Sequence, residues 1–244
     1  MLSVQNQLYT RWGRTLEPEN ILPEYPRPQF VRTDFQSLNG KWNYAFTKAG
    51  DHPESWHGKI LVPFSPESAL SGVGKQLMPD EWLWLERSFR VSANRRVLLH
   101  FGAVDQSCAV YINGKTAARH TGGYTPFSAD VTSFLKEGEN RLTVCIRDKS
   151  DTSFHARGKQ KLNRGGMYYT ATSGIWQSVW LEEVPAEYLE RIDSDFCDAD
   201  GTVRITPRGT GNRGSVRIRI FEPGIYRDKE FPAERVFEAF SKKH

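Results

Sequence analysis

Cysteine is scarce in this sequence. The 244 residues include three cysteines, Cys108, Cys145 and Cys197, an odd number without C-x-x-C spacing. A disulfide framework or a cysteine zinc site is therefore not expected. The six histidines also lack the spacing of a metal site. We expect no metal and no cofactor, and a reducing, cytoplasmic setting is the default.

Long apolar runs are absent as well. No segment approaches the length of a membrane span, and residues 1–7 lack the basic start and apolar centre of a secretory signal. The charges nearly cancel, because 33 Lys and Arg face 29 Asp and Glu for a net charge of +4. Nucleic-acid binding normally needs a strongly basic surface. The sequence therefore predicts neither a membrane nor a nucleic-acid partner.

Long amphipathic helices are the third absence, and short apolar runs bounded by turn residues take their place. The strands that we expect are Trp42–Thr47, Lys59–Pro63, Leu83–Val91, Arg96–Ala103, Cys108–Ile112, Thr116–Arg119, Phe127–Val131, Asn140–Arg147 and Ile175–Val184. This many short strands with long irregular connections are typical of a double-sheet jelly roll. The predicted fold class is all-β, with a jelly-roll β-sandwich.

Two local patterns make this prediction specific. Asn113-Gly114 follows an apolar run, and a two-residue turn favours this pair because both residues must take positive φ. We expect a β-hairpin there. In the strand expected at Ile175–Val184, alternation places Trp176 and Trp180 on one face and Val179 and Leu181 on the other.

The chain divides by composition into three parts. Residues 1–37 contain Pro18, Pro23, Pro26 and Pro28, which disfavour helix and central strand, so we interpret them as an extended arm. Residues 38–184 hold the jelly roll. Residues 185–244 form a further β segment, and apolar residues at 233, 236, 237 and 240 predict a short helix over Pro232–Lys242.

Two connections are much longer than hairpin turns. They are Phe64–Leu83 and Asp148–Ser173, and both are rich in polar and aromatic residues. Long loops without secondary structure in a compact domain usually serve a function. Paired glycines and a proline in Gly122–Pro126 indicate a further shaped loop beside them.

Several motifs carry a resemblance to a known family. They are Glu24–Gln29, Leu38–Trp42, Val62–Phe64, Glu86–Phe89, Phe101–Asp130, Gly158–Gln160 and Ser173–Glu182. In this order they resemble the amino-terminal sugar-binding domain of glycoside hydrolase family 2, the β-galactosidase and β-glucuronidase family. The resemblance runs from about Arg11 to about Val184. It implies a galactose-binding-domain-like jelly roll whose loops help to form a carbohydrate site.

The resemblance also sets expectations for the rest of such a protein. Relatives continue into an immunoglobulin-like sandwich of about a hundred residues, so residues 185–244 would be a partial one. A catalytic (β/α)₈ barrel of about 250 residues then carries two glutamates. There is no room for this barrel here, so we assign no catalytic residue and expect the chain to be inactive alone. The barrel is the implied partner, and a homo-oligomer stays open.

The residues that we assign to carbohydrate binding come from the long loops and from the segment His120–Pro126. They are Asp80, Glu81, Trp82, His120, Tyr124, Arg157, Lys159, Gln160 and Tyr168. Relatives place a carboxylate just before the Ser-Gly-Ile motif, whereas Gly166–Ser173 contains none. Tyr168 can stack on a sugar or donate to it instead.

Three functions stay open at this point. The first is an accessory portion of a family 2 β-glycosidase. The second is a freestanding lectin-like module whose sugar-binding edge is His120–Tyr124 with Tyr168 and Trp82. The third is a degenerate structural remnant.

Overall fold

The computed structural model describes residues 9–27, 32–91, 95–210, 215–218 and 235–238, the last two segments as backbone. The chain forms two compact units. The first comprises Met1–Pro26 and Arg32–Glu183, and the second comprises Arg27–Val31 and Val184–His244.

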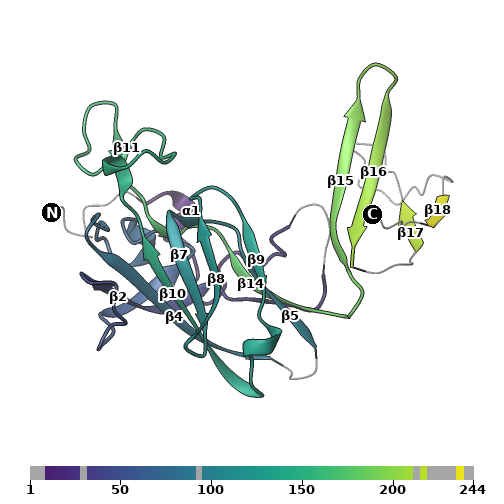
Figure 1. Cartoon of the computed structure of the whole chain (residues 1–244). Coiled ribbons are helices and arrows are strands. Elements are labelled where there is room, and N and C mark those ends of the chain that lie inside the picture. The colour runs from purple at the N-terminus through teal and green to yellow at the C-terminus, as the bar shows by residue number, and fades with distance from the viewer. Residues whose placement is uncertain (1–8, 28–31, 92–94, 211–214, 219–234, 239–244) are drawn as a thin grey trace. The chain divides into compact units, whose positions relative to one another are not determined.

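The first unit is built on two β-sheets, as Figure 1 shows. The larger sheet has six antiparallel strands in the order β3 (Gly58–Val62), β2 (Gly40–Thr47), β4 (Trp82–Val91), β10 (Gly138–Arg147), β7 (Ser107–Ile112) and β8 (Lys115–Thr121). The smaller sheet has the order β1 (Phe35–Ser37), β14 (Val179–Val184), β5 (Arg96–Phe101) and β9 (Phe127–Asp130). The predicted all-β fold and β-sandwich are confirmed.

Short elements fill the connections of this unit. They are α1 (Arg11–Arg14), the 3₁₀ turns Ala69–Ser71, Thr132–Phe134 and Ser150–Thr152, and the strand pairs β6 (Val104–Asp105) with β13 (Gly174–Ile175) and β11 (Gln160–Lys161) with β12 (Tyr169–Thr170). Among the described residues no helix is long and apolar enough to cross a membrane.

Alternation along the strands decides what enters the core. In β4, Leu83 and Leu85 belong to the buried apolar cluster, whereas Trp84 lies outside it on the other face of the sheet. In β14, Val179 and Leu181 belong to the same cluster. Successive side chains of a strand point to opposite faces, so each strand contributes every second residue to the core.

The hairpin predicted at Asn113-Gly114 is confirmed. Strands β7 and β8 pair on either side of it, and φ is 52° at Asn113 and 82° at Gly114. The Asn113 side chain also holds the neighbouring strand, because its Oδ1 accepts a hydrogen bond from Arg141 N at 3.0 Å. A side chain that tolerates positive φ and bonds to β10 explains why the turn forms here.

The strand predicted over Ile175–Val184 is wrong in its middle. Ile175 ends β13, β14 begins at Val179, and the two strands belong to different sheets. Trp176 lies between them and donates its Nε1–H to Gly123 O at 2.7 Å. The register therefore holds within β14, but Trp176 shares no strand face with Trp180. A side-chain bond to another loop has overridden the local pattern.

The amino-terminal arm is attached to the first unit through Glu182 in β14. Tyr25 Oη donates to Glu182 Oε1 at 2.6 Å, and Arg32 Nε lies 2.5 Å from Oε2. Trp180 Nε1 donates to Oε1 at 2.9 Å, and its ring stacks on His100. Glu182 is fully buried.

The second unit contains a long hairpin and one short strand pair. Strands β15 (Leu189–Cys197) and β16 (Thr202–Gly209) are antiparallel, as are β17 (Ser215–Ile218) and β18 (Arg235–Glu238). The helix predicted over Pro232–Lys242 is wrong at residues 235–238, which form β18. Its other residues lie outside the described ones. Val236 and Phe237 favour a strand, and pairing with β17 satisfies their backbone groups.

Candidate functional site

Three loops of the first unit meet at the end of the sandwich from which β11 projects (Figure 1). Ser173 Oγ donates to Glu67 Oε1 at 2.7 Å, which joins the two long connections. Gln76 Nε2 donates to Leu162 O at 3.2 Å across the same pair of loops. We call the residues gathered here the rim, and it comprises Asp105, Gly123, Tyr124, Asp148, Gln160 and Trp176.

Asp105 is the most unusual acidic residue of the rim. It ends β6, is 5% exposed, and lies so close to Gly123 that a Cβ added there would be 2.6 Å from its Cγ. Burial raises the pKa of Asp105 to about 7, and the charges of Asp148 and Glu67 add to the effect. Near neutral pH this carboxyl can therefore either donate or accept a hydrogen bond.

Asp148 is a second buried carboxylate and follows β10 directly. Its Oδ1 accepts from Ser150 N at 2.7 Å and lies 3.2 Å from His155 Nε2. Burial raises the pKa of Asp148, while the bond from Ser150 and the charge of His155 oppose the rise. The local turn after the strand positions this group.

Glu67 braces the site from the Phe64–Leu83 connection. Its two oxygens accept hydrogen bonds from Leu77 N at 3.1 Å, Ser173 N at 3.1 Å and Ser173 Oγ at 2.7 Å. Burial raises the pKa of Glu67, although these hydrogen bonds act to lower it. Because its acceptors are used within the protein, we assign Glu67 to positioning the loops.

Aromatic side chains form the outer part of the rim. Tyr124 is 47% exposed and meets the edge of Trp176 at 5.9 Å between ring centroids. Gln160 Nε2 donates to Tyr124 Oη at 3.5 Å, and Gln160 Oε1 accepts from Thr172 N at 2.7 Å. Exposed ring faces beside hydrogen-bonding groups are suited to polyhydroxylated ligands.

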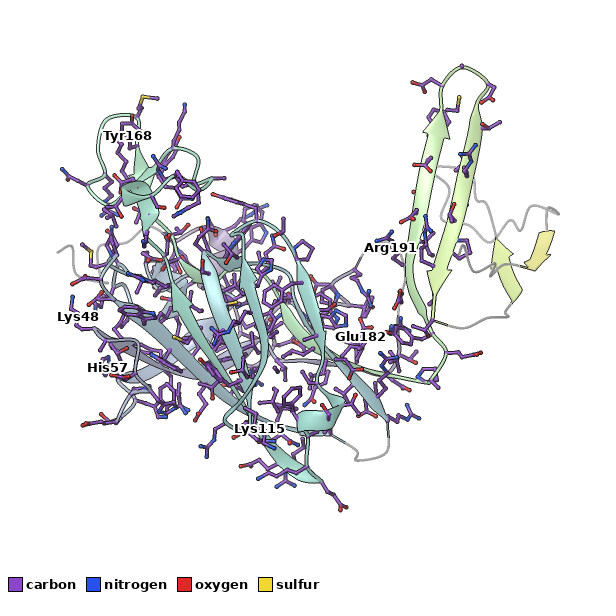
Figure 2. All side chains as sticks on the ribbon, viewed as in Figure 1. Lys48, His57, Lys115, Tyr168, Glu182 and Arg191 are labelled. Carbon is purple, nitrogen blue, oxygen red and sulfur yellow. The ribbon has the colours of Figure 1, made fainter. Side chains whose placement is uncertain are left out.

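The Asp148–Ser173 loop presents a further group of exposed large side chains. These are Phe154 (101% exposed), Met167 (60%), Tyr168 (38%) and Tyr169 (70%). Figure 2 shows Tyr168 on the part of this loop that extends beyond the sandwich. Lys161 Nζ lies 3.9 Å from the centre of the Tyr168 ring. A concentration of exposed apolar surface of this kind is typical of an interaction site.

Of the residues assigned from the sequence, the structure brings Tyr124 and Gln160 together. Tyr168 lies on the same loop as Gln160 but no contact joins it to Tyr124. Lys159 is exposed, and its backbone O accepts from Tyr169 N at 2.8 Å. Arg157 donates to Ser153 O at 2.9 Å within the loop.

The remaining assigned residues bond to other partners. Asp80 pairs with Lys48 at 2.8 Å, and Glu81, 7% exposed, pairs with Lys75 at 3.0 Å. The guanidinium of Arg147 lies 4.4 Å from the Trp82 ring centre. His120 Nε2 lies 3.0 Å from Gly122 O, and its ring stacks on Phe127. These contacts shape the surrounding loops.

Sequence reasoning missed Asp105 and Trp176 as rim residues. The paired glycines were the available signal, because one of them admits the Asp105 carboxylate. The bond from Trp176 to Gly123 joins residues that are distant in sequence, and no local pattern reports it. Among the described residues, no group of three His, Cys, Asp or Glu side chains could hold a metal ion.

An antiparallel β-sandwich that carries a polar and aromatic rim on its loops is an architecture shared with lectins and sugar-binding modules. Residues 80–185 match the family model "Glycosyl hydrolases family 2, sugar binding domain". The chain thus resembles the sugar-binding domain of this family, and the resemblance inferred from its motifs is confirmed.

Curated relatives bear glycosidase names. The chain is 24% identical to a putative β-glucuronidase of Formosa agariphila over 67% of its own length and 18% of that protein. It is 31% identical to a β-galactosidase of Thermoanaerobacter pseudethanolicus over 41% of its length and 13% of that protein. The chain spans less than a fifth of the length of either relative.

The solved structures that this chain resembles also bear glycosidase names. An uncultured Clostridium sp. β-glucuronidase is 25% identical with a TM-score of 0.59, over 88% of this chain and 40% of that one. A Lactobacillus rhamnosus β-glucuronidase is 26% identical with a TM-score of 0.58, over 78% of this chain and 35% of that one.

Proposed function

We propose that this chain is the amino-terminal, carbohydrate-contacting portion of a family 2 β-glycosidase whose catalytic groups lie on a separate (β/α)₈ barrel. The observation that carries the proposal is the rim. It combines a buried carboxyl that can donate or accept with exposed rings of Tyr124 and Trp176. The names of the relatives support carbohydrate as the ligand class.

The exposed side chains of the Asp148–Ser173 loop support the barrel as the partner. Phe154 and Tyr169 are largely surrounded by solvent, which costs free energy unless another surface covers them. In our proposal, the barrel and its bound substrate cover this loop. Tyr168 then takes the place of the carboxylate that other family members carry before the Ser-Gly-Ile motif.

The second unit has a proposed role as well. We infer that β15 to β18 belong to a partial immunoglobulin-like sandwich, because two antiparallel pairs are present and such sandwiches are built from antiparallel strands. A reducing, cytoplasmic setting is proposed because Cys108, Cys145 and Cys197 are all free thiols.

The proposal is tested with the purified chain. Aryl β-glucuronides and β-galactosides should not be hydrolysed, since hydrolysis needs two carboxyl groups placed about 5–9.5 Å apart across the scissile bond. Galactose and glucuronate, titrated by NMR, should bind with a dissociation constant of roughly millimolar, because a few net hydrogen bonds barely offset the association entropy.

The variants decide where the sugar binds. Tyr124→Ala and Trp176→Ala should abolish the NMR chemical-shift changes that the sugar causes. Lys115→Ala changes an exposed residue outside the rim and should leave these chemical-shift changes as they are in the unmodified chain. Turnover that disappears in Asp105→Asn would overturn the accessory role, because Asp105 would then act as an acid or base. Micromolar affinity that depends on Tyr124 would instead favour a freestanding lectin-like module.

A further inference from the structure

A pocket lies on the outer face of the six-stranded sheet, away from the core between the sheets. Its volume is about 490 Å³, which falls within the range of about 300–1,000 Å³ typical of small-molecule sites. The residues that define its chemistry are His52, Trp84, Glu86, Tyr111, Arg141 and Thr143. None of them belongs to the rim.

The strand register builds this pocket. Glu86, Thr143 and Tyr111 lie opposite one another on β4, β10 and β7. All three side chains face outward, because the adjacent residues Leu85, Val144 and Val110 enter the core. Alternate residues share a face, so Trp84 joins the same surface.

Two aromatic rings and a histidine line one side of the pocket. The Tyr111 ring stacks on Trp84, with 6.0 Å between ring centroids and 23° between the planes. His52 closes the pocket against Trp84, at 5.3 Å between centroids. Tyr111 is only partly buried, so part of its ring remains accessible.

Polar groups are placed beside this aromatic pair. Glu86 is 9% exposed, its Oε2 accepts from Thr143 Oγ1 at 3.2 Å, and Arg141 Nε lies 3.7 Å from the same oxygen. No hydrogen bond is found between the described residues and either Glu86 Oε1 or Tyr111 Oη. A carboxylate oxygen can accept more than one hydrogen bond, so Glu86 Oε1 is available as an acceptor for a molecule in the pocket.

The composition of the lining restricts the ligand. Its acidic residues, Glu86 and Glu139, are balanced by Lys136 and Arg141, so neither a strongly anionic nor a strongly cationic ligand is favoured. Aliphatic side chains are absent from the lining, which disfavours a lipid or hydrocarbon. An aromatic face beside paired donors and acceptors is suited to a neutral, polyhydroxylated molecule.

We propose that this pocket is a second carbohydrate site, which binds a neutral oligosaccharide with one sugar ring against Tyr111 and its hydroxyl groups on Glu86 and Arg141. The rim is not required for this binding. The site would hold the protein on an extended glycan while the rim contacts a chain end.

The test is calorimetric titration of the full chain with three neutral hexasaccharides, namely cellohexaose, xylohexaose and mannohexaose. At least one of them should bind. Tyr111→Ala should weaken that binding roughly 10-fold by removing the stacked ring, and Glu86→Gln should weaken it as well. Arg119→Ala, on the outer face of β8 and outside the pocket, is the matched control and should bind as the unmodified chain does.

The proposal has clear failing outcomes. It is wrong if none of the three hexasaccharides binds, or if binding survives both Tyr111→Ala and Glu86→Gln. Binding that is lost in Trp176→Ala but kept in Tyr111→Ala would place the glycan on the rim instead. Thermal melts check that each variant is folded. If Tyr111→Ala does not fold, Tyr111→Phe and Arg141→Ala replace it, with a smaller but measurable loss expected.

Discussion

Glu182 and Asp105 are both buried acidic residues of the first unit, with exposures of 0% and 5%, but their surroundings differ. Burial alone would raise the pKa of Glu182. The polar hydrogens of His100, Tyr25 and Trp180 outweigh this effect, so its pKa lies far below the ordinary value of 4.5. Around Asp105 burial raises the pKa, the negative charges of Asp148 and Glu67 raise it further, and the pKa reaches about 7.

The comparison separates a structural carboxylate from a candidate functional one. Glu182 uses its acceptors to hold the arm and β14 together. Asp105 ends β6 beside Gly123, and no hydrogen bond to its carboxyl is found among the described residues. Perturbed titration in a group beside exposed aromatic rings is typical of binding and active sites.

The largest expected effect is at Glu182. Glu182→Gln should lower the free energy of unfolding by about 3–5 kcal/mol, because the mostly buried Arg32 guanidinium loses its counter-ion and Tyr25 and Trp180 lose a charged acceptor. Denaturant unfolding at neutral pH measures this loss. Glu183→Gln, the next residue, is the control and should have little effect. The stabilisation by Glu182 should be present above about pH 4.5 and decline as the pH falls further, since its folded pKa is depressed. A loss as small as that of the control would contradict the structural role.

Removing one partner of Glu182 sharpens the comparison. Tyr25→Phe deletes the hydroxyl that donates at 2.6 Å to the carboxylate. A hydrogen bond to a charged group contributes about 1.5–3 kcal/mol, so we expect a loss in this range. Tyr9→Phe, on an exposed tyrosine, should leave the unfolding midpoint unchanged. Equal midpoints for the two variants would show that the arm is not held by this bond.

The close approach of Gly123 to Asp105 gives a prediction for the rim. Gly123→Ala should destabilise the protein by about 1–3 kcal/mol, because the added methyl group overlaps the carboxylate. In an Asp105→Ala background the same change should cost much less. A double-mutant cycle measured by thermal unfolding gives the coupling. Additive effects would mean that the two residues do not meet.

An effect of the opposite sign is expected for Asp105→Asn. Because its folded pKa is raised from 3.8 to about 7, ionisation of Asp105 costs stability as the pH rises through this interval. At about pH 8 the variant should be more stable than the unmodified chain, by up to about 4 kcal/mol for a shift of this size. The two should converge near pH 4, and unfolding measured across this range tests both points. Asp51→Asn, on an exposed residue, should show no such trend.

Local chemistry in the sequence was sufficient for the fold class and for much of the strand pattern. Neighbouring residues decide the positive φ at Asn113 and Gly114 and the alternation of side chains in β4 and β14. These predictions are confirmed. The break between Ile175 and Val179 and the strand at 235–238 were not predicted. In the first case a side chain bonds to a distant loop, and in the second a distant strand supplies the partner.

The candidate site, like the fold, was predicted in part from the sequence and decided in part by the tertiary structure. The sequence by itself determined that two long polar connections and a glycine loop exist, and that Tyr124, Gln160 and Tyr168 lie on them. Only the tertiary structure decided that Asp105 meets Gly123 and that Asp80 and Glu81 are used in ion pairs. The physical reason is that the pKa and hydrogen-bonding capacity of a carboxyl depend on its burial and on charges within a few ångströms, and residues far apart in the sequence supply both.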